Sequence, residues 1–428
     1  MSRLLADTTP LRNANFRRLW IAQIVTMIGG SLTVVSVPSQ IYEITGSSAY
    51  VGLTGIFGLV PLIIFGLWGG ALADVMDRRI LLLISTTGLI ATSALFWMQA
   101  ALGVNNVWLL LGIFSLQQAF FGVNSPTRNA ILPKILPLHD LPAANALNMT
   151  VFQAGSIVGP VIGGALIPLL GYSWLYLVDT LSLLTTLWAV IKLPSIRPDH
   201  DPDAPKRVAG IRSVLDGFGY LRGHPVLLMS FVVDLIAMIF GMPRALFPQI
   251  AHESFGGSDG GGLAFALLFA AISAGAVIGG VFSGWISRVR RQGLAVVVCI
   301  VIWGAAIAGF GGVLVFAHGT TLPILPIALL LLMIGGAADM VSAAFRQSML
   351  QSAASDDVRG RLQGVFTVVV AGGPRIADVA HGASAAAAGT VATTAGGGVL
   401  VVILVIVAAL AVPAFLRYRV PAVTRVTR

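Results

Sequence analysis

Residues 51–79 read VGLTGIFGLVPLIIFGLWGGALADVMDRR. The part from 51 to 73 carries no charged side chain and is long enough to cross the hydrocarbon core of a bilayer as a helix, which takes about 20 residues. The stretch then ends in a turn that holds Asp74, Asp77, Arg78 and Arg79. A long apolar run that stops at a charged turn is typical of a helix leaving a membrane, so it predicts an integral membrane protein.

The composition of the whole chain points to the same class. Apolar residues make up 57% and charged residues 10% of its 428 residues, whereas soluble domains carry about 25% charged residues. The formal net charge of +9 does not indicate nucleic-acid binding, because the basic residues lie between the apolar runs. Cys299 is the single cysteine, which excludes an internal disulfide and a four-thiolate metal site, and we expect no metal or cofactor.

Apolar runs of spanning length recur along the chain. We predict helices at 17–44, 51–74, 79–102, 106–130, 140–168, 172–193, 224–251, 262–288, 293–317, 322–350, 360–388 and 393–416. The first run is longer than the core of a signal peptide and is expected to stay in the mature protein. The predicted domains are an N-terminal six-helix bundle at 1–193, a central cytoplasmic loop at 194–223, a C-terminal six-helix bundle at 224–416 and a cytoplasmic tail at 417–428.

The basic residues predict the orientation of these helices. With the N-terminus inside, every Lys and Arg lies in a cytoplasmic segment or an adjoining helix end, apart from Arg244 and Arg375 inside predicted helices. The external loops then contain no Lys or Arg, as the positive-inside rule requires. We expect a multi-pass protein of the cell (inner or plasma) membrane with both termini cytoplasmic.

The two halves of the chain show internal repetition. Residues 69–79 align with 279–288, with a Gly-Gly pair and a following Arg at the same spacing. One common shift carries Arg128 onto Arg346, Gly155 onto Gly373 and Gly164 onto Gly382. Duplicated halves of this kind are frequent in transporters, where the solute path runs between the repeats.

The turn after the second predicted helix resembles the cytoplasmic signature of the major facilitator superfamily, commonly G-x-L-A-D-x-x-G-R-[RK]. The matching residues are Gly70, Leu72, Ala73, Asp74, Arg78 and Arg79. Asp77 stands where the pattern has its third Gly, and Val75 where an Arg is frequent. The resemblance implies an all-α polytopic membrane protein of 12 transmembrane helices in two six-helix pseudo-repeats, the major facilitator fold. It also implies that the charged residues of this turn form a gating network. The alternative is that they only keep the turn on the cytoplasmic side and make the loop soluble.

A second motif lies in the fifth predicted helix. Gly155, Gly159, Pro160, Gly163 and Gly164 form the pattern G-x-x-x-G-P-x-x-G-G. This pattern is similar to the element of exporters of the drug:proton antiporter type, with Ala146 in place of an upstream Gly. Small residues four apart allow close helix contact, and Pro160 bends the helix. The motif favours export over uptake.

Nearly the whole chain resembles the bacterial subgroup of the superfamily that contains the enterobactin exporter and macrolide efflux proteins. The stretches that carry this resemblance are VSVPSQIYEITGSSAYVGLTG, PTRNAILPKILP and DVRGRLQGVFTVVVAGGPRIADVAHG. The resemblance implies a small-molecule substrate and protons as partners, and a monomer is expected.

Ionisable residues inside predicted helices are candidates for coupling and substrate contact, because burying them in a membrane is costly. Asp234, near the middle of its helix, is the first choice for a protonated site, and Asp339 is an alternative. Arg244 balances Asp234 or attracts an anionic substrate.

Three further ionisable residues lie close together in the eleventh predicted helix. Arg375, Asp378 and His381 are three apart and share a helix face, which predicts either a proton relay or a local Arg375–Asp378 pair. Asp179 and Glu43 are interpreted as groups at the outer rim.

The predicted function is proton-driven export of an amphiphilic small molecule, a siderophore first, by alternating access. A multidrug pump of the macrolide or tetracycline type is the alternative within this class, and an uncoupled channel or lipid scramblase is the alternative outside it. An enzyme is not expected, because the sequence contains no H-E-x-x-H or G-x-S-x-G pattern. It also contains no G-x-x-x-x-G-K-[ST] phosphate loop, so ATP-driven transport by this chain alone is not expected.

Overall fold

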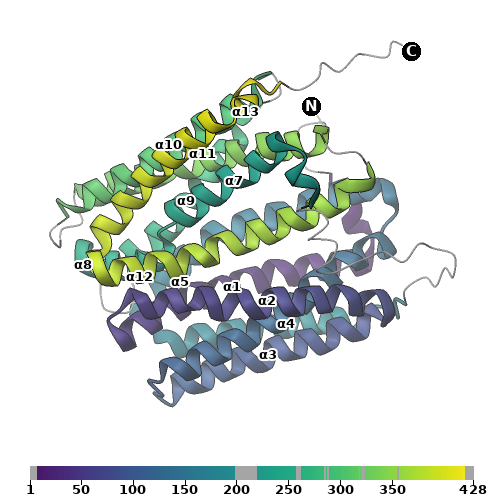
Figure 1. Cartoon of the computed structure of the whole chain (residues 1–428). Helices are drawn as coiled ribbons and strands as arrows, with labels where there is room; N and C mark the ends of the chain where they lie inside the picture. The colour runs from purple at the N-terminus through teal and green to yellow at the C-terminus, as the bar shows by residue number, and fades with distance from the viewer. Residues whose placement is uncertain are drawn as a thin grey trace, which may run out of the picture. The chain divides into compact units, whose positions relative to one another are not determined.

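The computed structural model describes residues 7–197, 219–256, 262–283, 286, 289–317, 319, 323–353 and 356–419 (Figure 1). All regular secondary structure in these residues is helical, which confirms the predicted all-α class. Ten helical segments among them are long and apolar enough to cross a membrane. In a bilayer, helices satisfy their own backbone hydrogen bonds, which explains why a chain of this composition is built from them.

The chain forms two compact units. Unit 1 takes in the described residues of Met1–Ile211 and Ala245–Ala270, and unit 2 those of Arg212–Arg244 and Ala271–Arg428. Unit 1 contains η1 (Thr9–Arg12), α1 (Ala14–Thr45), α2 (Ser48–Val75), α3 (Arg78–Ala101), α4 (Val107–Ile135), η2 (Leu138–Asp140), α5 (Leu141–Ile191) and α8 (Phe247–Phe255). Unit 2 contains α7 (Pro225–Gly241), α10 (Gln292–Leu314), α11 (Ile324–Ala353), α12 (Asp356–Ala411) and α13 (Pro413–Arg417). The unit boundaries fall within η3 (Arg244–Leu246) and α9 (Leu263–Val281).

Polar caps set the ends of the helices in unit 1. The Asn13 side chain accepts hydrogen bonds from the backbone of Asn15 and Phe16 at the start of α1. Gly46, with φ +62°, ends α1, in a conformation that glycine adopts without steric cost. Asn106 caps α4 in the same way as Asn13 caps α1, so both of these helices begin at a side-chain acceptor.

Two long helices are each interrupted by one glycine. Gly171 in α5 has φ +73° and ψ 170°, and Gly389 in α12 has φ +82° and ψ 164°. These dihedral angles are not helical, and the positive φ is readily adopted only by glycine. Each of the two elements therefore consists of two helices, divided where the sequence predicts a gap between spans.

The seventh predicted helix, 224–251, is not continuous. α7 ends at Gly241, Met242 and Pro243 are not helical, and the chain resumes through η3 into α8. Pro243 lacks a backbone N–H and so cannot continue the helical hydrogen bonding. The last predicted helix, 393–416, is likewise interrupted, because α12 ends at Ala411 and α13 begins at Pro413.

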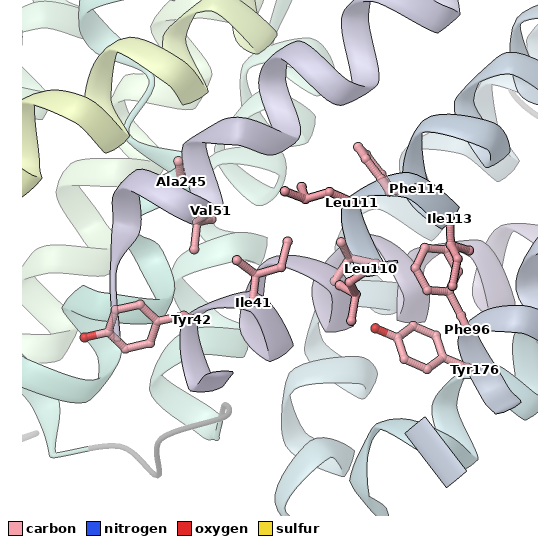
Figure 2. Close-up of a cluster of buried hydrophobic side chains, with 11 residues drawn as sticks. Ile41, Tyr42, Val51, Phe96, Leu110, Leu111, Ile113, Phe114, Tyr176 and Ala245 are labelled. Atoms are coloured by element: carbon pink, nitrogen blue, oxygen red, sulfur yellow. The ribbon is translucent and has the colours of Figure 1, made fainter. Parts of the chain in front are cut away.

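A cluster of buried apolar side chains holds unit 1 together (Figure 2). It comprises Val37, Ile41, Tyr42, Val51, Phe96, Leu110, Leu111, Ile113, Phe114, Tyr176 and Ala245. The rings of Phe96 on α3 and Tyr176 on α5 stack with centroids 5.1 Å apart. The cluster contains residues of all five helices from α1 to α5. These helices carry the polar groups of unit 1 that are described below.

Candidate functional site

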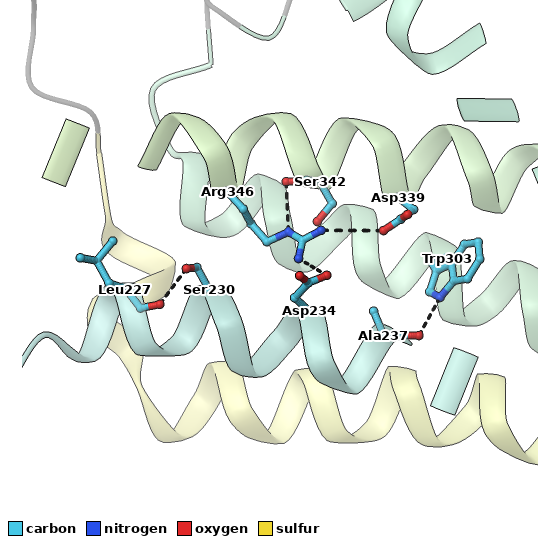
Figure 3. A network of polar contacts seen from close by, with 8 residues as sticks. All are labelled: Leu227, Ser230, Asp234, Ala237, Trp303, Asp339, Ser342 and Arg346. Carbon is cyan, nitrogen blue, oxygen red and sulfur yellow. Dashed lines mark hydrogen bonds and ion pairs between the residues drawn. The ribbon is translucent and has the colours of Figure 1, made fainter. Parts of the chain in front are cut away.

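A buried ion network connects two helices of unit 2 (Figure 3). Arg346 on α11 forms an ion pair through Nη1 with Oδ1 of Asp234 on α7. Its Nη2 lies 3.9 Å from Oδ1 of Asp339, and its Nε donates to the carbonyl oxygen of Ser342 at 3.4 Å. Asp234 and Arg346 are only 1% and 5% exposed. One guanidinium group is therefore shared between two carboxylates that the sequence singled out separately.

The partner of Asp234 differs from the one considered from the sequence. Arg244 was considered as the balancing charge, whereas the structure pairs Asp234 with Arg346. Asp339 and Arg346 lie seven residues apart on one face of α11, so both face the same side. Removing one member of a buried pair leaves the other charge uncompensated, so Asp234 and Arg346 depend on each other.

A second group of charges lies at the other end of α7. Arg244, in η3, is within electrostatic range of Asp378, Asp339 and Arg375. Arg375 and Asp378 are also electrostatic neighbours on α12. Together with the Asp234–Arg346 pair, these residues place three arginines and three aspartates in unit 2, and their formal charges cancel.

His381 contacts backbone rather than the neighbouring carboxylate. Its ring is 3% exposed and lies 3.0 Å through Nδ1 from the carbonyl oxygen of Ala377, on the same helix. A second hydrogen bond reaches the backbone of Phe240 on α7. His381 thereby connects α12 to α7.

The turn that carries the signature motif is held within unit 1. Asp77 caps α3 by accepting from the backbone of Arg79 at 2.9 Å. The same carboxylate accepts from Ser195 Oγ at 2.5 Å and from the backbone of Ile196 at 3.1 Å. Burial raises the pKa of Asp77, but the hydrogen bonds from Ser195, Ile196 and Arg79 outweigh it and lower this pKa below its ordinary value.

The two arginines of the turn bind helix ends. Arg78 donates to the carbonyl oxygens of Ala73 and Ala130, both at 3.1 Å, and Arg79 donates to that of Ile191 at 2.8 Å. These contacts tie α3 to the last turns of α2 and α5 and to α4. Gly70 has open space where a Cβ would lie, and the side chain of Asp74 lies outside the described part of the chain.

The glycines of the fifth-helix motif face α1. A Cβ at Gly155 would lie 3.2 Å from Met27, one at Gly159 would overlap Ser31, and one at Gly163 would touch Leu32. Pro160 is buried beside Gly159. The glycines let α5 approach α1 closely, which is the packing that small residues permit in membranes.

Gly164 has a different neighbour. A Cβ there would lie 2.6 Å from that of Ala266 on α9, and its carbonyl oxygen accepts from the backbone of Gly262 at 3.1 Å. The motif thus packs on two elements of unit 1.

The arginines related by the repeat make similar connections. Arg128 on α4 donates through Nη2 to the carbonyl oxygen of Leu19 at 3.0 Å and to Oε1 of Gln23 at 2.9 Å, both on α1. Arg346 on α11 reaches α7. Each arginine therefore joins the fourth predicted helix of its half to the first.

Asp179 was misjudged from the sequence. It is 2% exposed and lies inside unit 1, where its Oδ2 accepts from Thr33 at 2.7 Å and from Ser93 at 2.9 Å. Glu43, interpreted in the same way, is exposed and accepts from Tyr172 at 2.6 Å. The signal that could have identified Asp179 is the recurrence of polar residues every three to four positions in 33–43 and 172–186.

The helical architecture, with its long apolar segments, defines a class, the polytopic membrane proteins. Among solved structures, a bacterial homologue of the human lysosomal transporter Spinster matches with a TM-score of 0.70 and 16% identity over 97% of this chain and 100% of that one. The nucleoside transporter NupG matches with a TM-score of 0.68 and 13% identity, covering 95% of this chain and 100% of that one. These likenesses establish the fold of major facilitator transporters.

The sequence then identifies the family. The model of the transmembrane secretion effector family matches residues 5–424, and the chain belongs to this family. Among curated proteins, the enterobactin exporter EntS of Citrobacter koseri is 27% identical over 365 residues, which cover 82% of this chain and 80% of that protein. EntS of Shigella boydii is 27% identical over 359 residues with the same coverage. The protein is a multi-pass transporter of the cell membrane rather than an enzyme.

Proposed function

We propose that this transporter exports an amphiphilic small molecule, a siderophore first, and that export is driven by protons moving inward. The relatives named enterobactin exporter support a siderophore as the transported molecule. The observation that carries the coupling is the buried pair of Asp234 and Arg346, with Asp339 as a second carboxylate beside the same guanidinium. Ionisable groups inside membrane spans mark ion pathways, because an unused charge there would be costly.

The network suggests how a proton is converted into movement. A proton on Asp234 neutralises its carboxylate and leaves the Arg346 guanidinium to pair with Asp339 on its own helix. The bond between α7 and α11 is then released, and it forms again when Asp234 loses the proton. Such a two-state contact can bias alternating access, since each state holds a different arrangement of the same charges.

We also infer that the chain crosses the membrane twelve times in two six-helix repeats. Two of the ten apolar segments contain the breaks at Gly171 and Gly389, which raises the number of spans to twelve. Arg128 and Arg346 make matching connections in the two halves, which supports the duplication. The absence of Lys and Arg from the predicted external loops supports cytoplasmic termini.

Reconstituted transport tests this proposal. The full chain is reconstituted into proteoliposomes, a pH gradient is imposed across their membrane, and enterobactin is added as the probe. We expect enterobactin to accumulate against its gradient, and a proton uncoupler to abolish the accumulation. Transport that continues unchanged in the presence of the uncoupler would contradict coupled export and support an uncoupled channel or scramblase.

Asp234→Asn tests the coupling residue. We expect this variant to lose proton-driven accumulation while it is produced at the normal level. Asp7→Asn is the matched control, because Asp7 is exposed near the N-terminus and bonds only Thr9. Normal accumulation by Asp234→Asn would remove Asp234 from the mechanism.

Multidrug efflux is the second candidate, favoured by the glycine motif at 155–164. A deletion strain grown in low iron separates the two cargoes. Siderophore retained in the cells with unchanged drug sensitivity supports siderophore export. Normal siderophore secretion with new sensitivity to macrolides or tetracyclines would make multidrug efflux the function.

A further inference from the structure

Four polar contacts join α1 to the second helix of α5, at intervals along both. Thr26 and Thr186 hydroxyls lie 2.6 Å apart, and Thr33 donates to Asp179 at 2.7 Å. Further along, Tyr176 donates to Gln40 at 2.9 Å and Tyr172 donates to Glu43 at 2.6 Å. We call these four pairs the polar ladder. The ladder starts at the exposed Glu43 and continues into the buried part of unit 1.

Asp179 is the carboxyl group inside the ladder. Its Oδ2 accepts from Thr33 on α1 and from Ser93 on α3, and Ser93 in turn accepts from Thr180 at 3.1 Å. No cation lies within ion-pair distance of Asp179 among the described residues. This sets it apart from Asp234, which is equally buried but holds an arginine.

The surroundings of Asp179 contain one other titratable group. The facing residue of α1 is Thr33, that of α3 is Ser93, and α5 itself contributes Tyr176. The Tyr176 hydroxyl keeps its proton and donates a hydrogen bond to Gln40. Tyr176 is therefore neutral and does not balance a charge on Asp179. A carboxylate buried without a cation carries a large desolvation cost, which a bound proton removes.

The partners of Asp179 suit both protonation states. A hydroxyl group can donate to a carboxylate or, after rotation, accept from a carboxylic acid. Thr33 and Ser93 can therefore hydrogen-bond Asp179 with and without its proton. An arginine partner would allow only the charged form to be satisfied.

The two helices approach each other closely beside this residue. A Cβ on Gly29 of α1 would overlap Ser182 and would lie 3.0 Å from the Cα of Asp179. Ser36, one turn from Thr33 on α1, is fully buried, and its hydroxyl has no hydrogen-bond partner among the residues that the structure describes.

We propose that Asp179 is a second proton-binding site of the transporter, reached from the Glu43 end along the polar ladder. The proton adds to the carboxylate to give the acid, and the same O–H bond breaks when the proton leaves. The role of this proton in transport rests on the proposed export function, whereas the existence of the proton-binding site does not. Unit 1 then holds a proton site without an ion pair, whereas the proposed site of unit 2 contains one.

Infrared titration of the purified full-length protein tests the site without any substrate. We expect a carbonyl band of a protonated, buried carboxyl group that disappears as the pH rises and is missing in Asp179→Asn. A band of the same intensity in wild type and Asp179→Asn would overturn the proposal. Asp234→Asn serves as the comparison that should keep the band.

Hydroxyl variants keep the proposal testable if Asp179→Asn does not fold. Thr33→Val and Ser93→Ala remove donors that stabilise the carboxylate, so the titration midpoint of the band should move to higher pH. Thr92→Val is the matched control, because the Thr92 hydroxyl bonds only the carbonyl oxygens of Gly88 and Leu89 on its own helix. An unchanged midpoint in both hydroxyl variants would contradict the assignment.

Transport separates failure of the site from failure of the export function. With enterobactin as the probe, Asp179→Asn should lose accumulation driven by a pH gradient and keep exchange down a concentration gradient. Proton-driven accumulation at the wild-type rate would overturn a coupling role for Asp179. A titrating band in wild type without any enterobactin transport would instead refute the export function and leave the site standing.

Discussion

Arg346 is the residue on which the charges of unit 2 depend. It reaches Asp234 on α7 and approaches Asp339 on its own helix, while it is almost completely buried. Exchanging it for a neutral residue leaves a carboxylate inside the membrane without a cation, which is the costly case for a buried pair. The pair is therefore expected to act as one unit in mutational studies.

For Arg346→Gln we expect a loss of about 3–5 kcal/mol in stability, because breaking a buried pair strands the other charge. Thermal unfolding of the full chain in detergent measures it. Adding Asp234→Asn to Arg346→Gln should restore part of the loss, since residue 234 then no longer carries a charge without its cation. A double variant as unstable as the sum of the single variants would show that the two residues do not interact.

Asp77 gives a pH-dependent prediction outside the membrane. Its pKa in the folded protein is lowered, so its stabilisation is present above its ordinary pKa and is lost as the pH falls through the lower, folded value. We expect Asp77→Ala to lower stability by about 1 kcal/mol at neutral pH through loss of the helix cap. Thermal unfolding at a series of pH values should show this difference shrinking in acid; a constant difference would contradict it.

At the residue scale, the sequence predicts which groups matter better than how they pair. Asp234 and Asp339 were singled out because ionisable residues in apolar runs are conspicuous, and Arg346 because the internal repeat aligns it with Arg128. Their partnership was not predicted, since helical periodicity places residues on a face but does not say which helix lies opposite. Asp179 was interpreted as a rim group for the same reason: its burial depends on α1 and α3, which are distant in sequence.

At the scale of the helix, glycines determine how closely α1 and α5 approach. Gly29 and Gly159 both lie where a Cβ would overlap a serine of the other helix. Their positions explain why a motif of small residues in α5 needs a matching small residue in α1. Glycines on both helices therefore contribute to the close contact between α1 and α5.

Gly29→Ala should destabilise the protein by about 1–3 kcal/mol, because the added methyl group meets the Asp179 backbone and Ser182 in a filled interface. Gly30→Ala is the matched control, since a Cβ there has nothing within 4 Å. Thermal unfolding of both variants in the same detergent gives the comparison. Equal stabilities would mean that α1 and α5 are not closely packed at Gly29.

Most helix positions were predictable to within a few residues, although α9 ends at Val281 and not at 288 as predicted, but breaks inside apolar runs were not. The predicted span 17–44 corresponds to α1 at Ala14–Thr45, since apolar length and the capping residues both mark its ends. The break at Met242 and Pro243 was missed, because a hydropathy pattern stays apolar through it. Pro243 was the only local sign, and prolines also occur inside continuous helices of this chain, such as α1 and α2.

At the scale of the molecule, the orientation in the membrane can be tested with single cysteines. Cys299 is buried, so its replacement by Ser gives a background without other thiols. Asn105→Cys, exposed between α3 and α4, should react with a membrane-impermeant maleimide in intact cells. Arg290→Cys, also exposed, should react only after the cells are opened. The reverse pattern would place the termini outside.

The pairing of Asp234 with Arg346 also has an electrical consequence. A single charge that crosses the membrane field changes its energy by about 2.3 kcal/mol per 100 mV, so an unpaired carboxylate would make every conformational change sensitive to voltage. While the pair is formed, the carboxylate and the guanidinium lie side by side, and their contributions cancel. If Asp234 takes up a proton as proposed, this cancellation ends, and the movement that follows becomes sensitive to the membrane potential.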